Sequence, residues 1–163
     1  MYMKRVSLFL MFFLLCSCSR IGTESNEQDY EETKNYVVSC SLESNEQYMF
    51  FSQDDEIQSM QEVFYMSYED AGVTYDMDPE TVKENINDKL SNKYSQIAGV
   101  TVIVDEIVDY NIKIIVMIDF RVADMNQLIE QGLINEGNVQ NQYISLEQTM
   151  EAYSSNGFAC SYQ

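Results

Sequence analysis

The chain has 163 residues, enough for one domain and short additional segments. Its 27 acidic and nine basic residues give a formal charge of −18, and a polyanion without Lys/Arg clusters is excluded as a nucleic-acid-binding protein. The chain contains no histidine, which excludes Ser-His-Asp and Cys-His catalytic sites and metal sites built from imidazole.

Residues 1–17 are typical of a lipoprotein signal peptide. Lys4 and Arg5 form a short positive segment, and the ten residues from Val6 to Leu15 are apolar apart from Ser7. A run of that length is too short to cross ~30 Å of hydrocarbon as a helix, but it fits the apolar core of a secretion signal. We therefore expect the chain to be exported and residues 1–17 to be removed.

Two cysteines follow the apolar run, in the segment Leu15-Cys16-Ser17-Cys18. The segment resembles the lipobox of bacterial lipoproteins, with a leucine three residues before the modified cysteine and a small residue just before it. The resemblance implies that Cys18 becomes S-diacylglyceryl cysteine and anchors the chain to the extracytoplasmic face of a bacterial membrane. This would be the cell membrane of a Gram-positive cell or the outer membrane of a Gram-negative one. Cys16 is the competing candidate, but the bulky Leu15 before it fits a signal peptidase poorly; an ordinary cleaved signal or an uncleaved anchor are the alternatives.

Removal of the signal makes the chain more acidic. It takes away two basic side chains, so seven remain against 27 acidic ones, a charge of −20. This charge favours solubility, and it would also attract a cationic ligand, a cell-wall ligand or a basic envelope protein. Residues 18–35 are polar and acidic and are predicted to be the lipidated cysteine and a flexible tether. Residues 36–163 are predicted to form a single domain, for which the sequence indicates no oligomeric state.

Three strands are predicted at the start of this domain. YVVSCSL (36–42) alternates between apolar residues and serine, which indicates a half-buried strand. QYMFFS (47–52) is a second short strand, SQDDE (52–56) is typical of a turn, and IQSMQEVFYMSY (57–68) is a third strand. The third strand places four apolar residues on one side: Met60, Phe64, Met66 and Tyr68.

A helix of about five turns follows. Asp78 is a candidate N-cap, Pro79 suits the first helical position, and Glu80 favours the positive end of the helix. Apolar residues then recur at helical spacing and predict one buried stripe. The stripe consists of Val82, Ile86, Leu90, Tyr94 and Ile97. We expect the helix to end at Gly99 as its C-terminal cap.

The second half of the domain begins with two strands, VTVIVDEIV (100–108) and NIKIIVMIDF (111–120), which a short turn joins into an antiparallel hairpin. A short helix is predicted over 124–131. Ser145 to Gln148 matches a capping box that opens a last helix, and FACSY (158–162) is a final strand. The order β-β-β-α-β-β-α-α-β predicts a two-layer α+β domain with a mainly antiparallel sheet and helices on one face.

Three segments carry a family resemblance: YSQIAGV (94–100), IDFRVAD (118–124) and ISLEQTMEAYSSNGF (144–158). With these segments in this order, the chain resembles, over roughly residues 36–160, the YehR-like family of small bacterial lipoproteins of unknown function. The resemblance implies a compact α+β domain on a lipid tether. Because that family has no assigned activity, the resemblance implies no catalytic residue.

Cys40 and Cys160 are the two cysteines of the predicted domain, and both lie on apolar faces of predicted strands. Export makes a disulfide between them the expected state. The alternative is two separate buried thiols that behave as small apolar side chains.

Acidic side chains are the most abundant group in the chain that could act in catalysis or metal binding. Asp76, Asp78 and Glu80 have the spacing of a calcium loop, but Thr81 stands where such a loop needs glycine. The clusters 54–56 and 105–109 are typical of solvated turns. We therefore expect no metal, no cofactor and no catalytic residue.

The function that the sequence favours is that of a non-catalytic envelope lipoprotein that binds an unknown ligand or partner. The alternative is a glycosidase-like envelope hydrolase, which would need two carboxyl groups ~5–9.5 Å apart in a cleft.

Overall fold

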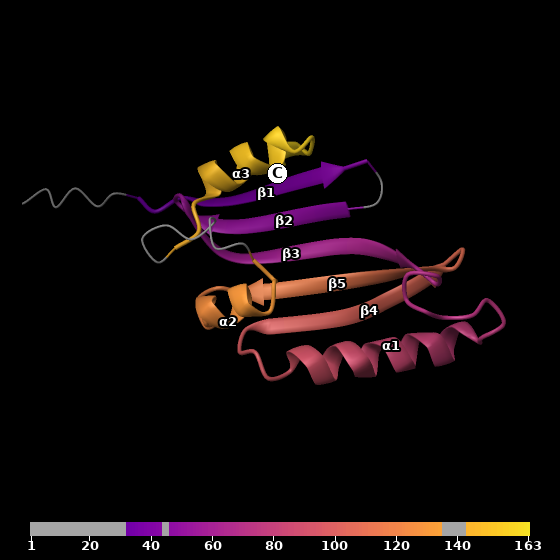
Figure 1. Cartoon of the computed structure of the whole chain (residues 1–163). Coiled ribbons are helices and arrows are strands. Elements are labelled where there is room, and N and C mark those ends of the chain that lie inside the picture. Colours follow the sequence, from indigo (N-terminus) through magenta and orange to yellow (C-terminus); the bar gives the residue numbers. More distant parts are fainter. Residues whose placement is uncertain (1–31, 44–45, 135–142) are drawn as a thin grey trace, which may run out of the picture. The chain divides into compact units, whose positions relative to one another are not determined.

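The computed structural model describes residues 32–43, 46–134 and 143–163 (Figure 1). Glu32–Gln163 forms one compact unit. The predicted signal peptide, Cys18 and most of the predicted tether lie outside the described residues. Within the described part, no helix has both the length and the apolar character that crossing a membrane requires.

The described chain forms one six-stranded antiparallel sheet and three helices, in the predicted order. The sheet order is β4-β5-β3-β2-β1-β6, so the last strand of the chain pairs with the first. The strands are β1 (Asn35–Leu42), β2 (Glu46–Gln53), β3 (Glu56–Ser67), β4 (Val100–Val108), β5 (Asn111–Asp119) and β6 (Ala159–Tyr162). The helices are α1 (Pro79–Tyr94), α2 (Met125–Glu130) and α3 (Leu146–Ser155). The predicted α+β class is confirmed.

One face of the sheet, called the inner face below, packs against the helices. On β5 it carries four buried residues in strict alternation: Ile112, Ile114, Val116 and Ile118. They form one core cluster with Val82 of α1, Leu128 of α2 and Leu146 of α3. Because residues two apart on a strand point to the same side, this alternation fixes which face the helices cover.

Helix α1 begins as predicted and runs along the β4 edge of the sheet (Figure 1). The Asp78 side chain accepts a hydrogen bond from the Thr81 N–H, which satisfies an N–H that the first turn leaves without a partner. The Val104 N–H donates to Asn87 Oδ1 at 3.3 Å, so the helix also covers a polar group of the edge strand.

The predicted end of this helix is wrong. The helix stops at Tyr94 with Ser95 as its cap, and Gly99 lies in the turn into β4. Gly99 has φ +76°, and a Cβ atom there would lie 2.6 Å from the Asp119 carbonyl oxygen. The glycine is therefore required by the close approach of two backbone segments and not by a helix cap.

The Cys40–Cys160 disulfide is present, with an S–S distance of 2.02 Å. The two residues lie directly opposite each other on β1 and β6. The Gln163 N–H donates to the Val37 carbonyl at 2.9 Å, so alternation makes Cys40 and Cys160 a non-hydrogen-bonded pair, in which side chains are closest. Their Cα atoms are 4.0 Å apart, just below the usual ~4.4–6.8 Å. The bridge ties the C-terminal strand to the first strand of the sheet.

Candidate functional site

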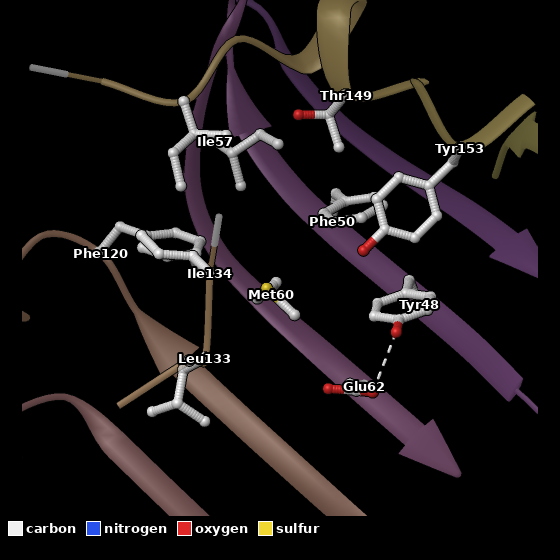
Figure 2. A pocket seen from close by; sticks show the side chains of 12 residues that line it. Tyr48, Phe50, Ile57, Met60, Glu62, Phe120, Leu133, Ile134, Thr149 and Tyr153 are labelled. Carbon is white, nitrogen blue, oxygen red and sulfur yellow. Dashed lines mark hydrogen bonds between the residues drawn. The ribbon is translucent and has the colours of Figure 1, made fainter. Parts of the chain in front are cut away.

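A pocket of about 220 Å³ lies over the inner face, beside α3 (Figure 2). Its apolar part comes from β2, β3 and the segments before and after 135–142. Among the described residues, the pocket is lined by Tyr48, Phe50, Ile57, Met60, Glu62, Phe120, Gly132, Leu133, Ile134, Ile144, Thr149 and Tyr153. An enclosed apolar space with a few polar groups is the usual form of a small-molecule site.

Helix α3 is held over this part of the sheet by its N-terminus. Ser145 accepts a hydrogen bond from the Gln148 N–H, which confirms the predicted cap. Asp55, in the turn before β3, accepts from the Glu147 N–H at 2.8 Å, and its carbonyl accepts from the Leu146 N–H at 2.7 Å. These bonds place Tyr153, two turns along the helix, above the inner face of β2.

The polar end of the pocket is a tyrosine between two acids. Tyr48 lies directly opposite Glu62 on β3 and two residues after Glu46 on its own strand. Its hydroxyl oxygen is 2.5 Å from Glu46 Oε1 and 2.9 Å from Glu62 Oε1; the second bond is drawn in Figure 2. Of the two acids, only Glu62 is among the residues that line the pocket.

The three groups must share protons, because a tyrosine hydroxyl has one proton to donate. If that proton is donated to Glu46, the contact with Glu62 is favourable when Glu62 carries a proton of its own. Burial is the largest cause that raises the pKa of Glu62; the nearby Glu46 charge raises it further, and the Tyr48 hydrogen bond opposes the change. Burial and then the hydrogen bond to Glu46 also raise the pKa of Tyr48. The pKa of Glu62 is therefore held above its ordinary value, chiefly by burial.

Aromatic rings surround this polar end. The Tyr48 and Tyr153 ring centroids are 4.6 Å apart, and Phe50 lies 5.4 Å from Tyr153, both in edge-on arrangements. Phe158 packs against both tyrosines, at 5.6 Å from Tyr48 and 5.0 Å from Tyr153. Burial and the Glu62 charge raise the pKa of Tyr153 to about 12, so its hydroxyl stays neutral.

The acidic clusters noted in the sequence do not line this pocket. Asp78 caps α1, and Asp55 anchors α3. Asp105 and Glu106 contact Lys113, at 2.8 and 3.3 Å. In the described ranges, no group of three or more His, Cys, Asp or Glu residues could hold a metal ion.

The sequence analysis does not identify Glu62 as a site residue, although the sequence contains one signal for it. The sequence predicts that Met60, Phe64 and Met66 share one side of the third strand, and Glu62, at an even-numbered position like these three, falls on the same side. An acid on an otherwise apolar strand face lowers the stability of the fold unless it is paired or hydrogen-bonded, so such a residue is a candidate for a functional role. That single irregularity of the alternation marks the site.

The opposite face of the sheet, called the outer face below, is also hollowed. A broader depression of about 480 Å³ lies over β2, β3 and β5. Val63, Tyr65 and Ile115 contribute apolar surface, and Lys113 and Glu43 contribute charge. Glu46, whose carboxylate accepts the hydrogen bond of the Tyr48 hydroxyl, also lines this depression.

Comparisons with known proteins support the fold. A family model described as a protein of unknown function (DUF1307) matches residues 32–159. The solution structure of Escherichia coli YehR is similar, with a TM-score of 0.57 and 17% identity over 79% of this chain and 91% of that one. The solution structure of a protein from Streptococcus pneumoniae TIGR4 has a TM-score of 0.55 and 12% identity over 99% of this chain and 98% of that one. The curated proteins give no match.

Proposed function

Because the chain belongs to the DUF1307 family of proteins of unknown function, we propose a function from its own pocket. The protein is a lipid-anchored module of the bacterial envelope that binds a small ligand and catalyses no reaction. The expected resemblance to the YehR-like family is confirmed by the family match and by the similar fold of YehR.

One observation carries this proposal: the inner face contains a pocket whose lining side chains are mostly apolar or aromatic, with Glu62, Thr149 and two tyrosine hydroxyls as its polar side chains. About 220 Å³ is the space of roughly seven water molecules in the liquid. Apolar side chains from two strands and from the connecting segments line it; Glu62 and the Tyr48 hydroxyl lie together, and Thr149 lies apart from them near Ile57 (Figure 2). This arrangement orients a small molecule by its polar end and gains affinity from burial of the rest.

The anchor is supported by the sequence of the N-terminus, which lies outside the described residues. Two acyl chains on Cys18 would hold the protein at the membrane far better than one. Replacement of Cys18 by Ala should abolish labelling with a palmitate analogue and release the protein from membranes. Cys16→Ala is the matched control and should leave both unchanged; retained labelling in Cys18→Ala would contradict the anchor.

The hydrolase alternative has one observation in its favour, namely two acids near each other. However, the Tyr48 hydroxyl lies between Glu46 and Glu62 and bonds to both. A retaining glycosidase needs its two carboxyl groups to flank the sugar, and here a protein oxygen already occupies that position. The geometry therefore supports binding more than hydrolysis.

The binding proposal can be tested with residues 19–163, which contain the whole compact unit. A panel of small fragments is screened by amide chemical shifts in solution NMR. Hits should shift residues around Ile57, Met60 and Thr149, and Leu133→Trp should weaken them because the larger ring fills the pocket. Val122→Trp is the control, because Val122 is 61% exposed and does not line the pocket. The proposal would be contradicted if fragments bound Leu133→Trp as well as the unchanged protein, or if no fragment bound at all.

A further inference from the structure

The chemistry of the ligand follows from an acid that lacks a basic partner. Glu62 is half-buried, and its hydrogen bond in the pocket is to a neutral hydroxyl. Among the described residues, the ion pairs are Lys113 with Asp105 and Glu106, and Arg121 with Asp119. No described lysine or arginine lines the pocket. A carboxylate that is partly removed from water is stabilised by a positive partner. Because no described residue provides that partner, a positively charged ligand could.

We propose that the pocket takes a small ligand with a protonated amine at one end and an apolar body, the amine lying against Glu62. The apolar body would fill the space toward Ile57 and Leu133 (Figure 2). This inference rests on the proposed function and adds the charge and polarity of the ligand.

The surroundings of Glu62 favour a cation in a second way. Tyr48, Phe50 and Tyr153 all line the pocket beside the acid, and aromatic rings attract ammonium groups by ~0.5–2 kcal/mol, most strongly where water is excluded. The Glu46 carboxylate, on the far side of Tyr48, adds negative charge close by. An ammonium group therefore meets a carboxylate and several rings at one place.

The same groups exclude the opposite charge. A fatty acid or a phosphate ester would place an anion beside Glu62 in a chain with a formal charge of −18, and like charges in a partly buried site repel. A neutral alcohol could bond to Glu62 but would bring no charge. The expected order of affinity is therefore cation, then neutral molecule, then anion.

Proton balance on binding is simple. Burial raises the pKa of Glu62, so any proton that Glu62 holds must leave before the carboxylate can pair with the ammonium. In the complex Glu62 is ionised, and a proton that it releases can pass to solvent through its hydrogen bonds with the Tyr48 hydroxyl and Glu46. No bond other than O–H is broken, and the ligand keeps its own proton.

The test uses three probes of equal length: hexylammonium, hexanol and hexanoate. Each is titrated into residues 19–163 near neutral pH and followed by amide shifts of the pocket residues. Hexylammonium should bind about tenfold or more tightly than hexanol, a difference of ~1.4 kcal/mol, and hexanoate should bind most weakly.

Substitutions assign the preference to Glu62. Glu62→Gln keeps the size of the side chain and should reduce hexylammonium affinity to that of hexanol while hexanol affinity changes little. Glu56→Gln is the matched control on the same strand, at an exposed residue that does not line the pocket. An intact, dispersed spectrum checks that each variant is folded.

The outcomes separate the two proposals. If all three probes bind the pocket equally, or if Glu62→Gln leaves the order unchanged, the inference about charge is wrong and the pocket remains a binding site. If none of the probes shifts pocket residues and the fragment screen also fails, the proposed function is wrong as well. Tighter binding of hexanoate than of hexylammonium would overturn the inference directly.

Discussion

Adjacent strands β5 and β3 present the same sheet face to the helices, yet they differ in what they place there. Val116 of β5 is 6% exposed and belongs to an unbroken apolar row. Directly opposite it on β3 lies Glu62, an acid that lines a pocket. The 16-residue helix α1 runs along β4, and the short α2 lies at the end of β5, whereas α3 lies beside β1 at the other side of the sheet (Figure 1). The comparison indicates that one half of the core provides stability and the other provides a cavity.

The largest expected effect is on the free energy of unfolding, when one buried side chain is truncated in each half of the core. Ile114→Ala should lower the free energy of unfolding by about 4 kcal/mol, because Ile114 is 1% exposed and its removal leaves a new cavity. Met60→Ala should cost less, about 2 kcal/mol, because Met60 already lines an empty space. Denaturant unfolding measures both; equal losses would mean that the two halves are packed alike.

The disulfide should give the next largest effect. The double variant Cys40→Ala with Cys160→Ala should lose ~2–4 kcal/mol, because the bridge closes a long loop of the unfolded chain. The loss should also loosen β6 and Phe158, which packs on the tyrosines beside the pocket. Hydrogen exchange should therefore increase around β1, β6 and α3 more than around β4 and β5.

The state of the bridge itself is checked by mass. Alkylation of the unreduced, denatured protein should add nothing at Cys40 or Cys160, and both should be alkylated after reduction. Two free thiols in the unreduced sample would contradict the bridge.

The smallest expected effect is a pH dependence that belongs to the pocket half alone. The folded pKa of Glu62 lies above its ordinary value of 4.5. Between these two values the folded chain holds a proton that the unfolded chain has lost, so the free energy of unfolding falls as pH rises. The groups near Glu62 are Glu46, Tyr48 and Tyr153, and the tyrosines stay neutral in this range.

Comparison with Glu62→Gln isolates this contribution. The variant should lose part of the decrease in stability between about pH 4.5 and the raised pKa, while the rest of the pH profile is unchanged. Urea unfolding at a series of pH values measures the difference. Identical slopes for the two proteins would mean that Glu62 titrates like an exposed acid.

Much of the fold could be predicted because its elements carry local signals. The alternation from Ile112 to Ile118 and the cap at Asp78 each depend on neighbouring residues only, and both are confirmed. The turn between β4 and β5 is confirmed too, with Asp109 and Tyr110 at positive φ as a two-residue hairpin turn requires.

Other features depend on contacts between distant residues. The role of Gly99 is set by the Asp119 backbone, and nothing in the local sequence around Gly99 shows this approach. The pairing of β6 with β1 has no local signal in the sequence apart from the two cysteines that the pairing brings together. For the site, Glu62 was visible as an acid on an apolar strand face, but Leu133 and Ile134 come from a segment without periodicity. Their contribution to the pocket follows from how α2 and the end of β5 place that segment.

The central claim is that a small cationic molecule enters the inner pocket, and contacts between ligand and protein test it most directly. Intermolecular NOEs are measured for hexylammonium bound to residues 19–163. The account predicts NOEs from the alkyl chain to the methyl groups of Ile57, Met60 and Leu133, with the carbon next to nitrogen nearest Tyr48 and Tyr153. NOEs to Val63 and Ile115 of the outer face, or an alkyl chain in the reverse orientation, would contradict it.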